Sequence, residues 1–286
     1  HAPFAGHDGI QLALGRSFRW EKDYLFPYYR DLLTVLAAGM TPYEIILNGL
    51  SKDADVAGGG RHMSNHFAKP SAGIQNVSSC TGNHTLHAAG VARAIKFYGG
   101  DEVAFSSQGE ASTSEGYVYE ALNGASREKL PVVFVIQNNR FGISVPVTQQ
   151  SANTRISDNY VGLKHLKIVN VDGTDFVDSY QGMQAAMEYA LSGEGPALVH
   201  AQCERLGAHS NSDRHELYRT KEEIESLQAL DPLAALRAKV IEAGILSEDD
   251  VTKMEADNEA ALAEDAEAAE KSADPDPDSV STFVLP

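Results

Sequence analysis

Short continuous apolar runs alternate with segments of helical spacing between residues 81 and 202. We predict four strands, in DEVAFSS, PVVFVIQ, LKIVNVDG and PALVHAQ. We predict three helices, in GNHTLHAAGVARAIKFYGG, SEGYVYEALNGASREK and FVDSYQGMQAAMEYALSG. Strands that are apolar throughout and alternate with helices indicate a parallel sheet covered on both faces. The pattern therefore predicts an α/β fold with a doubly wound, mostly parallel sheet.

Helical patterns flank this region on both sides. The first sixty residues carry apolar positions at helical spacing in GIQLALGRSF, YRDLLTVLAAG and TPYEIILNGL, and Thr41-Pro42 is a typical helix start. After Asp231-Pro232 the helical spacing returns. We therefore divide the chain into a helical N-terminal region (1–60), an α/β domain (61–225) and a helical C-terminal region with an acidic, Pro/Asp-rich tail (226–286).

Composition and charge narrow the class of protein. The chain has 286 residues, of which 43% are hydrophobic and 22% charged, as in ordinary globular proteins. The formal net charge of −17 argues against a nucleic-acid partner, and no apolar run is long enough to suggest a membrane partner. Cys80 and Cys203 form no disulfide framework, which favours an intracellular, reducing compartment. The start at His1, without methionine, is typical of a processed chain or a piece of a longer one.

Two polar turns follow neighbouring strands. Gln108-Gly109-Glu110 comes after the first strand of the series, and Asn138-Asn139 after the second. A right-handed strand–helix–strand unit brings both strand ends to one edge of the sheet, where open α/β sheets bind ligands. Gly109 permits a close backbone approach, and the start of the next helix favours a phosphate. Since amide oxygens are acceptable ligands for Mg²⁺, Gln108 and Asn139 predict a magnesium–diphosphate site.

Other interpretations of these features stay open. Glycine and asparagine are also common turn residues after strands. The two turns alone therefore support a purely structural role as well as they support a magnesium–diphosphate site. A dinucleotide site has less support because no G-x-G-x-x-G follows an early strand. His62, His66, His84 and His87 match no zinc signature, and we expect the last two to line a pocket wall.

Several segments together resemble a known family. The chain is similar to the α subunit, or α half, of the thiamine-diphosphate-dependent decarboxylating component of 2-oxoacid dehydrogenase complexes, branched-chain type. The resemblance covers nearly the whole chain and implies the thiamine-diphosphate-binding fold, with 61–225 as the diphosphate-binding domain. It rests on FPYYRD, GGGRHMSNHF, SSCTGNHTLHAAGVARAIK, SQGEASTSEG, VIQNNRFGIS, VDGTD and RLGAHSNSD, which occur in the family's order.

The resemblance also implies a set of site residues. The catalytic residue would be His209, beside Ser210, a serine that is phosphorylated in some animal relatives. The implied magnesium ligands are Gln108, Asn139 and the backbone carbonyl of Phe141, and the implied residues at the thiamine diphosphate are Tyr29, Arg30, Ser79, Gly109, Glu110 and His209.

Five residues depart from the family's pattern. The first metal position is usually Asp or Glu, so the neutral Gln108 predicts weaker magnesium retention than a carboxylate gives. Gln137 stands where some branched-chain relatives have Arg. A potassium site of some relatives is not assumed here, since its pattern is not kept at Cys80, Asn83 and His84.

The resemblance finally implies partners and a reaction. A β subunit or β half would carry the catalytic Glu, in an assembly of two α and two β parts. The assembly would oxidatively decarboxylate a small 2-oxo acid, branched-chain by the segments HMSNHF and SSCTGNH, and acylate the lipoyl group of an acyltransferase. It would lie in the cytoplasm of a bacterium or the mitochondrial matrix of a eukaryote. The alternatives are an acetoin- or pyruvate-specific relative and a non-catalytic α/β binding module that has lost the cofactor.

Overall fold

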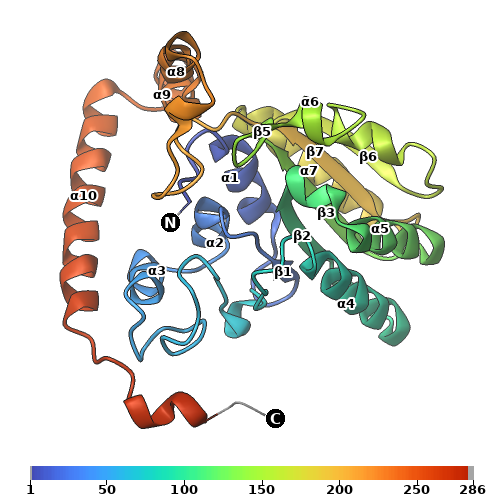
Figure 1. Cartoon of the computed structure of the whole chain (residues 1–286), viewed down its shortest axis with the longest axis horizontal. Coiled ribbons are helices and arrows are strands. Elements are labelled where there is room, and N and C mark those ends of the chain that lie inside the picture. Colours follow the sequence, from blue (N-terminus) through green and yellow to red (C-terminus); the bar gives the residue numbers. More distant parts are fainter. Residues whose placement is uncertain (1, 283–286) are drawn as a thin grey trace.

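A five-stranded parallel sheet forms the centre of the computed structural model, which describes residues 2–282. Its strand order is β1-β2-β3-β7-β6, and every neighbouring pair is parallel (Figure 1). The predicted α/β fold with a mostly parallel sheet is confirmed. The strands are β1 (Tyr24–Phe26), β2 (Ala104–Gly109), β3 (Val132–Asn138), β6 (Lys167–Asp172) and β7 (Ala197–Gln202), and a separate antiparallel pair follows β3, with β4 (Phe141–Gly142) and β5 (Val145–Pro146).

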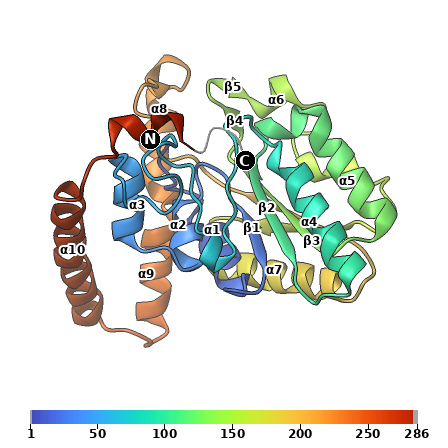
Figure 2. The same ribbon diagram turned by 90° about the horizontal axis from the view of Figure 1, so that it is seen from below.

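Helices cover both faces of the sheet, so the fold is doubly wound. On one face lie α4 (His84–Tyr98) and α5 (Gly116–Glu128) (Figure 2). They pack against side chains such as Phe134 and Ile136. On the other face, α1 (Asp8–Ser17) and α7 (Phe176–Leu191) pack against Phe105, Val133 and Val135. Because alternate residues of β2 and β3 face opposite layers of helices, both strands are buried at every position. The edge strand β6 is only partly buried.

The N-terminal region contributes a strand that the helical pattern did not predict. Strand β1 lies at the edge of the sheet, where Tyr24 pairs with Ala104 of β2. It has three residues, too few to show a period of two. The predicted helices of this region are present as α1, α2 (Leu32–Ala37) and α3 (Pro42–Gly49), and Thr41 caps α3 in a capping box with Glu44.

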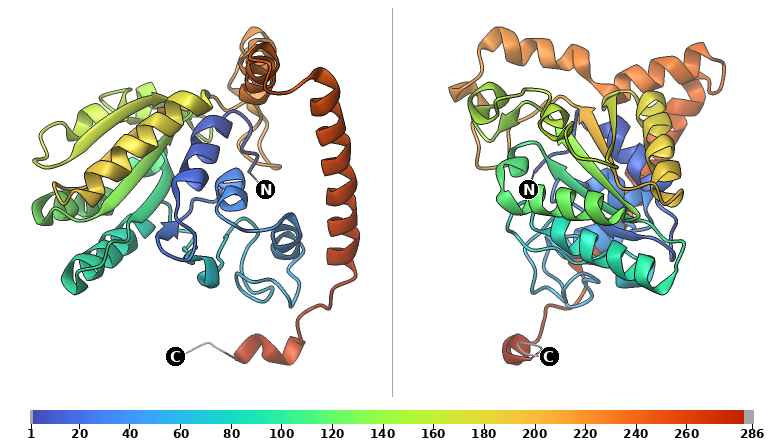
Figure 3. Two further views of the ribbon diagram at one scale, coloured as in Figure 1. Left: turned by 180° about the vertical axis from the view of Figure 1, so that it is seen from behind. Right: turned by 90° about the vertical axis from the view of Figure 1, so that its right-hand side faces the viewer.

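The C-terminal helices form an arm beside the sheet domain. They are α8 (Lys221–Leu227), α9 (Pro232–Glu242) and α10 (Glu248–Glu270), and the short α6 (Val147–Gln150) lies earlier, after β5. Helix α10 packs against α3 and stands apart from the sheet (Figures 1 and 3). The end of the predicted acidic tail, residues 283–286, lies outside the described residues. The domain limits at 60 and 225 stay a prediction. No helix within residues 2–282 is long and apolar enough to cross a membrane.

Strands β2 and β3 bring the two polar turns to one edge of the sheet. They pair in register over six positions, ending with Gly109 opposite Gln137. Residues 110 and 139 therefore follow neighbouring strands at the same end, as the sequence predicted. This edge is where the fold offers a ligand site.

Candidate functional site

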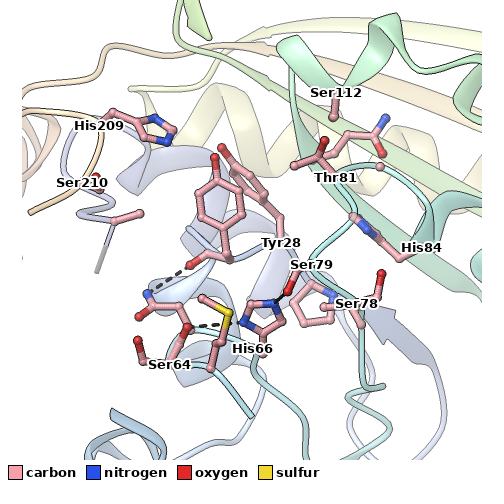
Figure 4. A pocket seen from close by; sticks show the side chains of 18 residues that line it. Tyr28, Ser64, His66, Ser78, Ser79, Thr81, His84, Ser112, His209 and Ser210 are labelled. Carbon is pink, nitrogen blue, oxygen red and sulfur yellow. Dashed lines mark hydrogen bonds between the residues drawn. The ribbon is translucent and has the colours of Figure 1, made fainter. Parts of the chain in front are cut away.

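Two adjoining cavities lie at the carboxyl edge of β2 and β3. The first, of about 550 Å³, is lined by Glu110, Asn139 and Phe141 and is called the Glu110 cavity here. The second, of about 280 Å³, is lined by Gln108 and His84 and is called the Gln108 cavity. In the Gln108 cavity, His209 and Ser210 lie on one side of Tyr28, with Thr81, His84 and Ser112 on the other (Figure 4). The residues that line both cavities are Tyr28, Tyr29, Thr81, Ser112 and His209.

Glu110 brings a buried carboxylate into the first cavity. Its side chain is 1% exposed, and Oε2 accepts a hydrogen bond from the backbone N–H of Asn139 at 3.3 Å. Oε1 is buried and has no hydrogen-bond partner among the described residues. Burial raises the pKa of this carboxyl group, while the charges of Arg205 and Arg30 lower it. A buried carboxylate oxygen without a partner is costly, so this position favours a cation.

Asn139 is held by a histidine that the sequence did not single out. Its Nδ2 donates to Nε2 of His7 at 3.0 Å, and its Oδ1 accepts from the N–H of Phe141 at 3.2 Å. His7 is fully buried, and its Nδ1 donates to the carbonyl of Phe4 at 2.9 Å. Burial, with the nearby charge of Arg30, lowers the pKa of His7 to about 3. The imidazole is therefore neutral, and its Nε2 accepts a hydrogen bond from the amide nitrogen of Asn139. This contact orients the Asn139 amide so that its oxygen lies on the side away from His7.

Tyr29, Arg30 and His209 meet at the boundary of the two cavities. The Arg30 guanidinium lies 5.6 Å from the centre of the Tyr29 ring, and its Nη2 lies 3.3 Å from Nδ1 of His209. Burial, then the charges of Arg30 and Arg205, lower the pKa of His209 to about 4. His209 is thus neutral near pH 7. Since its Nδ1 accepts from Arg30, Nε2 carries the proton and is the ring atom that can donate to a ligand.

Arg205 is a candidate site residue that sequence reasoning missed. The side chain is fully buried, and Nη2 donates to the carbonyl of Ile143 at 2.9 Å and to the Tyr218 hydroxyl at 2.6 Å. Its Nε and Nη1 are buried without a hydrogen-bond partner in residues 2–282. A buried guanidinium with two unpaired N–H groups favours an anion beside it. The segment RLGAHSNSDR also contains the exposed Arg214, and only burial distinguishes the two arginines.

Gln108 lies apart from the other two predicted metal ligands. It lines the Gln108 cavity, whereas Asn139 and Phe141 line the Glu110 cavity. Successive strand residues point to opposite faces, and Gln108 shares the α4 side of β2 with Ala104. Strand β2 ends at Gly109, two residues beyond the predicted strand, so Glu110 is the first residue to turn over the edge. The structure therefore groups Glu110, and not Gln108, with Asn139.

Ser79 and the nearby histidines line the Gln108 cavity. Nε2 of His66 forms a hydrogen bond with Oγ of Ser79 at 2.8 Å. His84 is buried, its Nε2 bonds the carbonyl of Ser107 at 2.7 Å, and burial lowers its pKa to about 4. His84 thus lines a pocket wall, as expected, whereas His87, for which the same was expected, is exposed and lines neither cavity. Within residues 2–282, no three His, Cys, Asp or Glu side chains come together as a possible metal cluster.

Gln137 points away from both cavities. Its Nε2 donates to Oδ1 of Asp31 at 2.5 Å and to Oγ of Ser107 at 2.8 Å, and its Oε1 accepts from Gln11 at 3.0 Å. Because both its amide nitrogen and its amide oxygen form hydrogen bonds inside the protein, Gln137 is not free to contact a phosphate.

Comparison with known proteins places the chain in a family. The family model described as "Dehydrogenase E1 component" matches residues 2–278. Similar proteins are the 2-oxoisovalerate dehydrogenase subunit alpha of Bacillus subtilis, 38% identical over 85% of this chain and 74% of the relative, and the 3-methyl-2-oxobutanoate dehydrogenase subunit alpha of Mycobacterium tuberculosis, 34% identical over 87% of this chain and 64% of the relative. The pyruvate dehydrogenase E1 component subunit alpha of Mycoplasma pneumoniae is 33% identical over 91% of this chain and 70% of its own length. The chain spans less than two thirds of the Mycobacterium relative. The chain belongs to the dehydrogenase E1 component family.

Proposed function

We propose that this chain is the α part of a 2-oxoacid dehydrogenase and binds the magnesium–diphosphate end of thiamine diphosphate in the Glu110 cavity. The observation that carries the proposal is the unpartnered, buried Oε1 of Glu110, which lies in one cavity with Asn139 and Arg30. The carboxylate and the amide can bind a cation, and the neighbouring guanidinium groups can bind an anion. Together these groups suit a diphosphate that carries a metal ion.

Magnesium would be held by Glu110, Asn139 and the backbone carbonyl of Phe141. All three line the same cavity, and Mg²⁺ prefers hard oxygen ligands with negative charge. The sequence prediction used Gln108 as the first ligand. The geometry favours Glu110 instead, because its carboxylate adjoins Asn139 and has an oxygen without a partner among the described residues.

The diphosphate would lie against Arg30, Arg205 and the backbone at Gly109. Arginine binds phosphate oxygens through its planar fork, and Tyr29 packs against the Arg30 guanidinium. A Cβ at position 109 would lie 2.9 Å from the Tyr28 hydroxyl. Because Gly109 has no side chain, the backbone at this position can lie close to Tyr28 in the Glu110 cavity.

Thiamine diphosphate, when bound, supplies the carbon nucleophile and the electron sink for decarboxylation of a 2-oxo acid. His209 contributes a neutral imidazole with its proton on Nε2, at the boundary of the two cavities. It is suited to donate to the oxygen of a 2-oxo acid on which negative charge develops. Arg30 keeps His209 in this tautomer and lowers its pKa.

A β subunit with the catalytic Glu, in an assembly of two α and two β parts, would complete the site. A lipoyl-bearing acyltransferase would accept the acyl group. The α-subunit names of the relatives support the β partner, and two of the three name branched-chain substrates. The proposed substrates are therefore branched 2-oxo acids, with pyruvate as the second candidate because of the Mycoplasma relative.

Carbon dioxide release and lipoyl acylation by the chain together with its β partner test the proposal. We expect turnover of 2-oxoisovalerate above pyruvate and acetoin, and none from the chain alone. Full turnover without the β partner would contradict the proposal that a β subunit completes the site. Turnover of acetoin alone would indicate the acetoin-cleaving alternative, and turnover of nothing would favour the non-catalytic module.

A further inference from the structure

Gln108 has two buried amide atoms without a hydrogen-bond partner. Its side chain is 1% exposed, and both Nε2 and Oε1 lack a partner within the described part of the chain. Two other buried glutamines, Gln11 and Gln137, do have hydrogen-bond partners. Nε2 of Gln11 donates to the carbonyl of Arg30 and to Gln137, and Nε2 of Gln137 donates to Asp31. Since buried polar groups are nearly always paired in native proteins, the unpaired amide of Gln108 points to a missing ligand.

The wall around Gln108 offers neutral hydrogen-bonding groups. Ser79, Thr81 and Ser112 line the same cavity, together with the neutral imidazole of His84. No Lys, Arg, Asp or Glu is among the described residues that line it. The charged groups Arg30 and Glu110 line the neighbouring cavity instead. A second carboxylate on a ligand would therefore find no cation here, whereas an uncharged polar group would find both a donor and an acceptor.

The position of the cavity connects it to the substrate. Tyr28, Tyr29 and His209 line both cavities, so a ligand that extends beyond the Glu110 cavity past His209 enters the Gln108 cavity. Apolar groups such as Val77 and Met63 also line it. The cavity thus combines an apolar wall, suited to a branched side chain, with one unpaired amide.

We propose that Gln108 is a specificity-determining residue that selects 2-oxo acids with a branched side chain bearing a neutral amide or hydroxyl group. The inference rests on the proposed function and refines its substrate class. A purely hydrocarbon side chain would leave the amide of Gln108 unpaired, whereas an amide of the same shape would satisfy its donor and its acceptor.

Two acids of equal shape provide the test. In 2-oxosuccinamate, an amide oxygen and nitrogen replace the two terminal methyl groups of 4-methyl-2-oxopentanoate. The value of kcat/KM is measured for each acid with the chain and its β partner. We expect the wild-type protein to prefer the amide by about tenfold or more. The Gln108→Met variant should lower the ratio of the two values by roughly 100-fold, because it removes the amide and keeps the length of the side chain.

A matched control is Gln184→Met, on α7. Nε2 of Gln184 donates to Oγ of Ser17 at 3.0 Å, away from both cavities, so the ratio should stay at the wild-type value. Gln108→Leu serves as a second variant should the methionine variant not fold, and thermal unfolding reports the folding of each.

Two outcomes would overturn the inference. One is a wild-type preference for the hydrocarbon acid by tenfold or more, and the other is an unchanged ratio in a folded Gln108 variant. If the wild-type assembly decarboxylates neither acid, and neither 2-oxoisovalerate nor pyruvate, the proposed function itself fails, which is a distinguishable result.

Discussion

At the scale of single residues, burial decides which polar groups belong to the site. The sequence placed Gln108, Gly109 and Glu110 in one turn, but strand alternation separates them by direction, and only the end of β2 shows that Glu110 turns toward Asn139. Arg205 has no distinguishing pattern in the sequence. Its role follows from a guanidinium that is fully buried and only partly paired.

Arg205→Met should weaken the binding of thiamine diphosphate. The variant removes a buried cation with two unpaired N–H groups, and charge-assisted hydrogen bonds of this kind correspond to a loss of roughly 10- to 100-fold in affinity. Calorimetric titration of the α/β assembly with thiamine diphosphate and magnesium measures it. Arg214→Met is the control, because Arg214 is exposed and pairs with Glu216. Equal affinities in both variants would remove Arg205 from the site.

At the scale of elements, periodicity predicted nearly all of the sheet and its helices. The strands β2, β3 and β7 are recognisable because nearly all of their residues are buried, on one face of the sheet or the other. The edge strand β6 is only partly buried and is recognisable by its apolar residues Ile168, Val169 and Val171. Strand β1 was missed because three residues carry no period, and its pairing with β2 depends on the tertiary fold. The candidate site was predicted as two turns at one edge. The side chains that fill it, including His7 from the N-terminal region, depend on contacts over more than 100 residues.

Two helical glycines should respond in opposite ways to alanine. A Cβ at Gly15 on α1 would lie 2.5 Å from Cβ of Ala37, so Gly15→Ala should separate α1 from α2 and cost about 1–3 kcal/mol. A Cβ at Gly90 on α4 meets no described atom within 4 Å, so Gly90→Ala should stabilise the chain by up to about 1 kcal/mol. Urea unfolding of the isolated chain measures both. Destabilisation of similar size in the two variants would contradict this packing.

At the scale of the whole molecule, charge is unevenly distributed between the site and the arm. Residues 221–282 carry eighteen acidic and five basic side chains, and α10 exposes many of them to solvent. The site instead holds the buried, neutral histidines His7 and His84, and a third buried histidine, His200, lies outside both cavities. Burial is the main cause that lowers the pKa of His7 to about 3, and of His84 and His200 to about 4.

The free energy of unfolding should therefore fall as the pH drops below 6.5. The unfolded chain takes up protons on these three histidines near pH 6.5, and the folded chain does not until pH 3 to 4, so acid favours unfolding. The half-buried His209, with a pKa of about 4, acts in the same direction. Asp31 acts in the opposite direction below pH 6, because burial raises its pKa to about 6. The net loss should be roughly 2 kcal/mol between pH 6.5 and 5.5. Urea unfolding at the two pH values measures this loss of stability. The His84→Gln variant should lose less stability than the wild-type chain. A constant free energy of unfolding over this pH range would refute the prediction.

Magnesium-dependent binding of thiamine diphosphate to Glu110→Gln and Gln108→Met is the measurement that tests the central claim most directly. The two variants alter neighbouring positions at the end of β2, and both are titrated calorimetrically in the α/β assembly. We predict that Glu110→Gln weakens binding by at least about tenfold, because the metal loses its only carboxylate ligand. Gln108→Met should keep the wild-type magnesium dependence. Loss of magnesium dependence in Gln108→Met with wild-type binding in Glu110→Gln, or no heat from the wild-type assembly, would contradict the account.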